Sequence, residues 1–152
     1  ELSYLEAECQ RKLGRNAVAE KLYRSLLQGA WAGSAYHGLG LLYAERDLPK
    51  ALGYLRRAAT LRPTDARLRN DLGYALMLAR RYPEARAELS TAVELDPVDI
   101  TNRNNLIVLL LGQGDEAGAR TMARAADLSD ETLAGLRRQA QSFRVNAGAQ
   151  RG

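Results

Sequence analysis

Small and apolar residues recur along this chain in a four-position pattern with a period of about 34 residues. Each copy begins with alanine, and the second residue follows after four positions. The third follows after three more and the fourth after five more, and the fourth is proline in the two middle copies. The copies are Ala19, Tyr23, Leu26 and Trp31; Ala51, Leu55, Ala58 and Pro63; Ala85, Leu89, Ala92 and Pro97; and Ala119, Ala123, Ala126 and Glu131. Such a period indicates a stacked array of helix-turn-helix units.

Turn and cap signals place the helices within each unit. Asp47 before Leu48-Pro49 predicts an N-cap followed by proline in the first helical turn, where no backbone donor is needed. Pro83 gives the same signal in the next unit, and Asp115 is placed to cap the last second helix. The pattern therefore divides most of the chain into four helix pairs, over residues 1–32, 33–65, 66–99 and 100–128.

A further helix is predicted at the C-terminal end. It begins at Ser129-Asp130-Glu131, an acidic first turn that suits the helix dipole, and continues through Leu133, Leu136 and Phe143. We expect it to cap the array over residues 129–144, because a terminal repeat needs a cover with one polar side. Residues 146–152 are predicted to be a disordered tail, so that a single domain spans residues 1–145.

Composition excludes two classes of partner. All 18 acidic residues and 18 of the 22 basic ones lie within residues 1–133, so that this stretch is formally neutral. It has no basic face of the kind that binds nucleic acid. The longest apolar run, residues 106–111, is far shorter than the roughly 18 residues of a membrane span. We therefore expect neither nucleic-acid binding nor direct membrane insertion by this segment.

Catalytic and metal-binding chemistry is also not expected. His37 is the only histidine and Cys9 the only cysteine, which falls short of a usual zinc site. Residues 38–40 and 112–114 are rich in glycine but lack the lysine and serine or threonine of a phosphate loop. We predict a protein that is not an enzyme and has no cofactor, with Cys9 as a small buried hydrophobic residue.

The repeated residues are those that define tetratricopeptide (TPR) repeats, and about 130 of the 152 residues resemble an array of them. The Leu39-Gly40 and Leu72-Gly73 pairs, with small residues on the second helices, resemble the positions where the helices of a TPR pair approach closely. Ile107 and Glu131 depart from the pattern in the last unit. The resemblance implies an all-α fold: a right-handed α-solenoid of about four TPR helix pairs plus a C-terminal capping helix.

One branch of the family is more similar than the rest. The sequence NDLGYALM at residues 70–77 has a counterpart 34 residues later that begins with Asn104-Asn105-Leu106. The whole resembles the TadD-like TPR lipoproteins of tight-adherence (Tad, Flp) pilus assembly. That resemblance implies a pilotin-like accessory scaffold whose partner is an outer-membrane secretin, located at the periplasmic face of the outer membrane if the chain belongs to a lipoprotein.

In TPR arrays the first helix of each pair lines a concave groove, which implies a partner-binding surface here. Counting from the packing leucines, the candidate groove residues are Tyr4, Arg11, His37, Leu41, Asn70, Tyr74, Met77, Asn104 and Val108, with Glu8, Glu45 and Leu111 as further candidates. Asn70 and Asn104 occupy the same place in successive units, so that their amides are either stacked toward a ligand or bonded to a neighbouring loop. Leu41, Val108 and Leu111 either face the groove or pack on neighbouring helices.

Two other functions remain open from the sequence. One is a cytosolic TPR adaptor or co-chaperone that binds a peptide tail, and the other is a TPR appendage of a larger enzyme. A clamp for a chaperone C-terminus is disfavoured, because the expected basic positions are neutral or acidic, as at Asp71 and Asn105. A signal peptide with a lipid-acceptor cysteine ahead of Glu1 would favour the envelope scaffold over the cytosolic adaptor.

Overall fold

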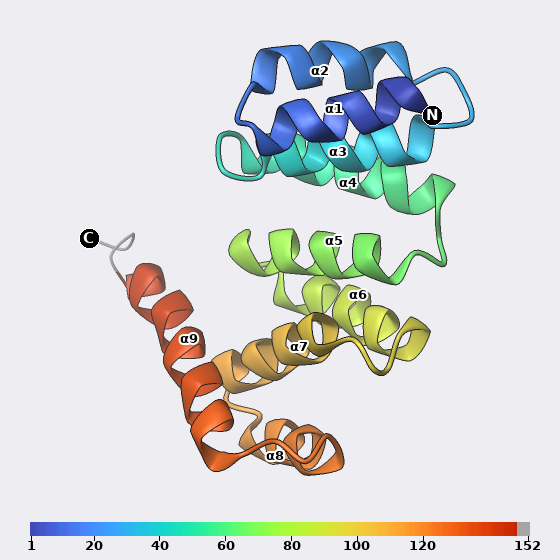
Figure 1. The fold of residues 1–152 in the computed structure, drawn as a ribbon. Helices are drawn as coiled ribbons and strands as arrows, with labels where there is room; N and C mark the ends of the chain where they lie inside the picture. Colours follow the sequence, from blue (N-terminus) through green and yellow to red (C-terminus); the bar gives the residue numbers. More distant parts are fainter. Residues whose placement is uncertain (149–152) are drawn as a thin grey trace.

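The computed structural model describes the backbone of residues 1–148 and the side chains of residues 1–143. Over this range the chain forms nine helices and no strand (Figure 1). The helices are α1 (Leu2–Lys12), α2 (Asn16–Ser25), α3 (Ala32–Tyr43), α4 (Leu48–Leu61), α5 (Ala66–Leu78), α6 (Tyr82–Leu95), α7 (Ile100–Gln113), α8 (Glu116–Ala125) and α9 (Asp130–Gly148). The all-α fold class is therefore confirmed.

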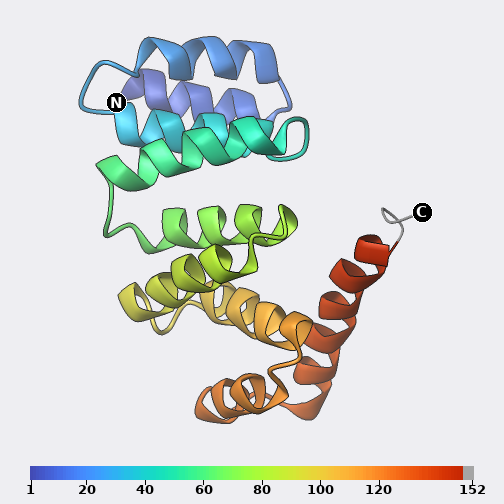
Figure 2. The same ribbon diagram turned by 180° about the vertical axis from the view of Figure 1, so that it is seen from behind.

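The first eight helices form four antiparallel pairs that stack one after another (Figures 1 and 2). Within each pair the two helices pack closely, and between pairs the second helix packs on the first helix of the next: α2 on α3, α4 on α5, and α6 on α7. Each unit therefore packs its own two helices together and meets the next unit through its second helix. The buried apolar side chains form two clusters, one over α1, α2 and α3 and one from α4 to α9.

The alanine that begins each copy of the four-position pattern lies in the core. Ala19, Ala51, Ala85 and Ala119 are all 0% exposed. Glycine on the first helix completes the close approach: a Cβ on Gly73 would lie 2.7 Å from Leu89 Cγ, inside any allowed contact distance. Gly40 meets Leu55 in the same way. The predicted role of the Leu-Gly pairs in helix packing is confirmed, and in the last pair Ile107, also 0% exposed, takes the place of glycine.

Aspartate caps begin four of the helices. Asp47 accepts a hydrogen bond from the backbone N–H of Lys50 over 3.1 Å, and Asp115 accepts one from Gly118 over 2.9 Å, as the sequence predicted. Asp65 and Asp99 do the same for α5 and α7, over 3.0 Å and 2.8 Å. These side chains bind backbone donors that the first turn of a helix leaves free.

The structure differs from the sequence analysis in three places. The second unit was expected to begin at residue 33, but its first helix, α3, already begins at Ala32. α9 continues to Gly148, so residues 146–148 are helical rather than part of a disordered tail, and residues 149–152 lie outside the described part of the chain. Cys9 is exposed on α1 rather than buried, because no described helix packs on that side of the first unit.

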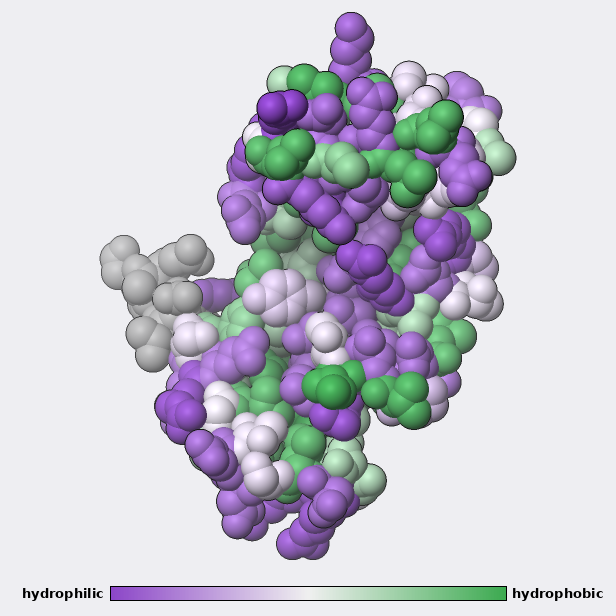
Figure 3. All heavy atoms as spheres, in the orientation of Figure 1, coloured by the Kyte–Doolittle hydropathy of each residue, from purple (hydrophilic) through white to green (hydrophobic). Residues whose placement is uncertain are grey.

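α9 leaves the path of the stack. It packs on α7 rather than on α8, and it rises along the array toward the level of α5 (Figures 1 and 2). The surface in the same view mixes hydrophilic and apolar residues, with a group of apolar residues over the first unit (Figure 3). Exposed apolar side chains of that unit include Leu2, Leu5, Leu13 and Val18.

Candidate functional site

The candidate groove residues lie at equivalent positions of the first helices, α1, α3, α5 and α7. We call this surface the inner face. One set is Tyr4, His37, Asn70 and Asn104; a second is Glu8, Leu41, Tyr74 and Val108; a third begins with Arg11 and includes Met77 and Leu111. Because members of a set are separated by one repeat, they recur at the same place in each unit.

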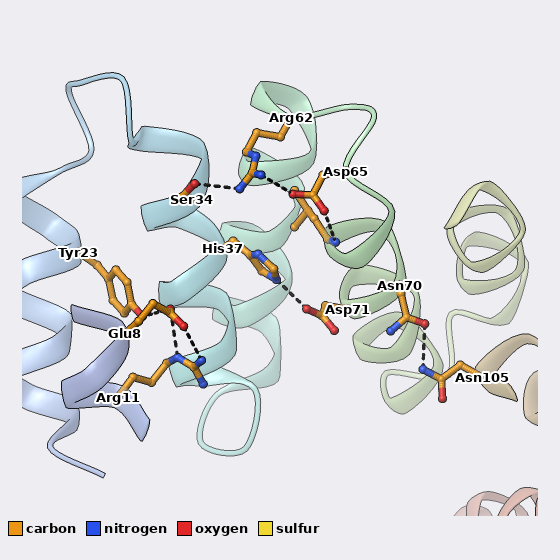
Figure 4. A network of polar contacts seen from close by, with 11 residues as sticks. Glu8, Arg11, Tyr23, Ser34, His37, Arg62, Asp65, Asn70, Asp71 and Asn105 are labelled. Carbon is orange, nitrogen blue, oxygen red and sulfur yellow. Dashed lines mark hydrogen bonds and ion pairs between the residues drawn. The ribbon is translucent and has the colours of Figure 1, made fainter. Parts of the chain in front are cut away.

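At the first unit the inner face carries a charged cluster (Figure 4). Arg11 Nη2 lies 2.9 Å from Glu8 Oε2, and the Tyr23 hydroxyl donates a hydrogen bond to the same carboxylate. Burial acts to raise the pKa of Glu8, but the hydrogen bonds from Arg11 and Tyr23 outweigh it and hold that pKa below 4.5. Burial and the Glu8 contact together raise the pKa of Tyr23. Glu8 is therefore a fixed anion between two helices.

Tyr4 extends this cluster with aromatic surface. Its ring stacks on that of Trp31 with centroids 5.1 Å apart, and it lies 6.4 Å from the ring of Tyr23. Burial is the main cause that raises the pKa of Tyr4, with a further contribution from Glu8, whereas the charge of Arg67 acts in the opposite direction. Arg67 belongs to α5, so its field reaches α1 across the inner face.

Polar rungs join the inner faces of successive units (Figure 4). His37 Nε2 lies 2.7 Å from Asp71 Oδ2, which links α3 to α5. Asn105 Nδ2 donates to Asn70 Oδ1 over 2.9 Å, which links α5 to α7. His37 is equivalent to Asn70 one unit on, and it contacts the residue after it, Asp71. Asn70 is likewise equivalent to Asn104, and it bonds the residue after it, Asn105. These side chains hold the curvature between units, because each rung fixes the distance between two first helices.

The far end of the inner face is covered by α9. Phe143 sets its ring edge-on to Tyr74, with centroids 6.2 Å apart. Met77 and Val108, which lie next to this contact, are 2% and 1% exposed. The surface that the sequence analysis expected to be open at α5 and α7 is thus occupied by the chain itself.

The structure therefore separates the nine candidate residues into two groups. His37, Asn70, Met77 and Val108 are buried, so the expectation that they point into an open groove is corrected: two are taken by rungs and two by apolar packing near α9. Tyr4, Arg11, Leu41, Tyr74 and Asn104 keep partial exposure. Of the further candidates, Leu111 is buried, while Glu45 is exposed. Partner binding by any of them stays a prediction.

Sequence reasoning missed two residues of this surface. Arg67 lines a cavity of about 340 Å³ between the start of α5 and the start of α7, with Asn70, Asp71, Asp96, Asp99, Thr101 and Asn102 as the other lining residues. Its place one turn before Asn70 is a helical spacing that could have marked it. Phe143 was assigned to the cap, but its contact with α5 carries no signal in the sequence.

The described residues offer no metal cluster of three or more histidine, cysteine or acidic side chains. Among the same residues, no helix combines the length and the apolar character that crossing a membrane requires. The partly exposed residues of the inner face are aromatic, aliphatic and charged or polar side chains.

Comparison with known proteins agrees with this geometry. A tetratricopeptide repeat family model matches residues 42–102, which run from the end of α3 to the start of α7. TPR repeat-containing protein PA4299 of Pseudomonas aeruginosa is 38% identical over 134 residues, covering 88% of this chain and 54% of the relative. The chain therefore contains tetratricopeptide repeats. It spans about half the length of that relative.

Two solved structures place this TPR chain among other arrays. MamA (AMB-1) has a TM-score of 0.69 at 23% identity, covering 85% of this chain and 72% of the other, which shows the fold alone. A mutant O-GlcNAc transferase of Thermobaculum terrenum has a TM-score of 0.67 at 28% identity, covering 73% of this chain but 22% of the transferase. The TPR family generally serves as a scaffold for protein–protein interaction, and its members bind protein or peptide partners.

Proposed function

We propose that this TPR chain is a non-enzymatic scaffold that binds a segment of a partner protein along the open part of its inner face, over α1, α3 and the start of α5. The observation that supports this most directly is the partial exposure of Tyr4, Arg11 and Leu41 beside buried rungs. The rungs hold the helices in place, so that binding costs little ordering of the scaffold.

The chemistry of the open part suits a peptide segment. Tyr4 offers a flat aromatic surface supported by Trp31, Leu41 adds aliphatic contact, and Arg67 adds an exposed cation. Aromatic and arginine side chains are the residue types that most often dominate binding energy at protein interfaces. A partner strand or helix that lies along the array would meet these groups in turn.

We further propose a role as a pilotin-like accessory factor of Tad/Flp pilus assembly, with an outer-membrane secretin as the partner. The support is the resemblance carried by residues 70–77 and their counterpart around Asn104, together with a bacterial relative that is 38% identical. In this proposal the protein acts at the periplasmic face of the outer membrane, held there by a lipid anchor on the natural gene product.

The test is a calorimetric titration of the C-terminal segment of the cognate pilus secretin into the chain. Tyr4→Ala with Leu41→Ala should weaken binding by about 2 kcal/mol or more if these are hot spots. Arg57→Ala, on an exposed position of α4 away from the inner face, is the matched control and should bind like the wild type. Equal binding by the folded double variant would place the site elsewhere. Failure of the wild type to bind would favour the cytosolic adaptor.

A second candidate is a TPR appendage of a larger enzyme. It is supported by the similarity to an O-GlcNAc transferase, which is 28% identical and matches this chain over 22% of its own length. The two proposals differ in what the full gene product contains: an added catalytic domain supports the appendage, whereas a lipoprotein signal supports the envelope scaffold. Mass spectrometry of the mature protein from its native cells distinguishes them.

A further inference from the structure

α9 presents one apolar edge to the array. Leu133, Leu136 and Ala140 are 8%, 7% and 3% exposed, and Phe143 continues the same edge. Their spacing of three, four and three residues follows the helical repeat, so the four side chains form one stripe along the helix. The stripe belongs to the same core as Val108, Ile107 and the rest of α7. α9 is therefore an amphipathic helix that packs its apolar stripe on α7.

The path of α9 is not that of another repeat. In each earlier junction the second helix of a unit packs on the next first helix, as α6 does on α7. α9 instead packs on α7 and passes beyond it, so that Phe143 contacts Tyr74 one unit earlier (Figures 1 and 2). Tyr74 and Val108 are equivalent inner-face positions in successive units. α9 thus runs past equivalent inner-face positions of two successive units.

Polar contacts and cavities describe how well α9 fits. Arg137 donates to Glu116 at the start of α8, with Nε 3.1 Å from Oε1, which fixes the helix in register. A cavity of about 190 Å³ remains beside this pair, lined in part by Leu111 and Ala140. A second, of about 350 Å³, lies around the Phe143 end, lined by Tyr74, Met77, Leu78, Arg80, Tyr82, Ser142 and Phe143. The surface is larger than the side chains that α9 places on it.

We propose that the inner face of α5 and α7 is a helix-binding surface, that α9 is its resident occupant, and that the partner is an amphipathic helix which takes the place of α9. This inference rests on the proposed function and extends it from the open part of the inner face, over α1, α3 and the start of α5, to the part that α9 covers. The partner helix carries large apolar residues at the spacing of the α9 stripe and a basic residue after the second of them. A side chain larger than Ala140 fills the cavity beside Glu116 and Arg137. An aromatic residue at its far end, in the place of Phe143, reaches the cavity at Tyr74.

The attachment of α9 to the same chain decides how strongly a partner binds. A tethered helix competes at a high effective concentration, so the wild-type chain binds an added helix weakly. When only a fraction of molecules has the surface free, the apparent dissociation constant is the intrinsic constant divided by that fraction. A change that loosens α9 without altering α5 or α7 raises this fraction. It therefore lowers the apparent dissociation constant of an added helix by the factor by which the fraction rises.

The experiment uses the full chain and a fluorescent synthetic peptide of residues 129–148 as the added helix. Phe143→Ala in the chain removes the contact with Tyr74 from its own α9 but leaves that surface intact. We expect the peptide to bind this variant at least about tenfold more tightly than the wild-type chain. Arg137→Ala, which breaks the ion pair with Glu116 and leaves the core unchanged, is a second way to loosen α9. Gln139→Ala, at an exposed position of α9, is the matched control and should bind like the wild type.

Two readouts can overturn the proposal. Tyr74→Ala added to Phe143→Ala should abolish the gain, so undiminished peptide binding by this double variant places the peptide elsewhere. Peptide that binds neither the Phe143→Ala nor the Arg137→Ala chain, each with wild-type helicity, shows that α9 is a fixed part of the fold. Titration of the secretin segment into the same variants separates this inference from the proposed function. Secretin binding without peptide binding overturns the inference alone, and peptide binding without secretin binding overturns the pilus role alone.

Discussion

Asn105 on α7 donates a hydrogen bond to the side-chain oxygen of Asn70 on α5 over 2.9 Å, and Asn70 is only 4% exposed. The amide of one repeat thus fastens it to the next instead of facing a ligand. His37 and Asp71 repeat the arrangement one unit earlier, 2.7 Å apart. These polar side chains of the inner face therefore set the geometry of the stack. In the proposed function the partner contacts the side chains next to them.

Asn105→Ala should destabilise the array. The change leaves the buried oxygen of Asn70 without its donor, which costs about 1–3 kcal/mol when a polar group stays unsatisfied. Asn104→Ala is the matched control on the neighbouring position, since the Asn104 side chain accepts from the adjacent Arg103 at 3.3 Å rather than from another unit among the described residues. Urea unfolding followed by circular dichroism measures both. Equal free energies of unfolding for the two variants would show that the rung contributes nothing to stability.

Asn70 and Asn104 also show what could and could not be predicted from the sequence. The 34-residue spacing of Asn70 and Asn104 correctly placed both on the same position of successive units. It could not show that Asn70 bonds Asn105 rather than a ligand, because the offset between neighbouring first helices depends on how the units rotate against each other. The small residues at Ala51 and Ala85 were easier to assign, since burial between paired helices follows from the repeat itself.

The C-terminal helix shows a second limit of prediction from the sequence. Its apolar spacing at Leu133 and Leu136 predicted an amphipathic capping helix, and both side chains are buried. Periodicity shows which side of a helix is apolar but not which surface of the array receives it. The contact between Phe143 and Tyr74 depends on the direction of the chain after Ser129, and that direction closed the part of the inner face that the sequence left open.

Gly73→Ala should destabilise the third unit. A Cβ at Gly73 would lie 2.7 Å from Leu89 Cγ and 3.1 Å from the Leu89 backbone nitrogen, so the paired helices must move apart. Overpacking of this kind costs about 1–3 kcal/mol. Gly53→Ala is the matched control: it lies within α4 with no atom within 4 Å of the added Cβ. That variant should gain about 0.5–1 kcal/mol from the better helix propensity of alanine. Thermal melts that order the two variants the other way would contradict the packing.

Ala85→Leu tests the same contact from the second helix. Ala85 is 0% exposed between α5 and α6, so a leucine side chain has no space without displacing its neighbours. We expect a loss of about 1–3 kcal/mol in the free energy of unfolding. Ala87→Leu, two residues on at an exposed position of α6, should change stability by less than about 0.5 kcal/mol. A wild-type melting curve for Ala85→Leu would show that the register of this helix pair is wrong.

The charged cluster of the first unit should make stability depend on pH through Glu8. Hydrogen bonds from Arg11 and Tyr23 outweigh burial and lower its pKa in the folded state below 4.5. A group whose pKa is lower when folded binds more protons when unfolded, so its contribution is complete above the unfolded pKa. The contribution then disappears as the pH falls through the folded-state pKa. Acidification should therefore loosen α1 from α2.

Glu8→Gln isolates this contribution from those of other carboxylates. At neutral pH the variant should be less stable than the wild type, because the charged acceptor for Arg11 and Tyr23 is lost. Below pH 4.5 the difference should shrink, since the wild-type carboxylate is then increasingly protonated. Glu6→Gln, at an exposed position of the same helix, is the control and should follow the wild-type profile. The measurement is urea unfolding at a series of pH values. A stability difference between Glu8→Gln and wild type that stays constant through acidification would mean that Glu8 is not held as an anion by its two partners.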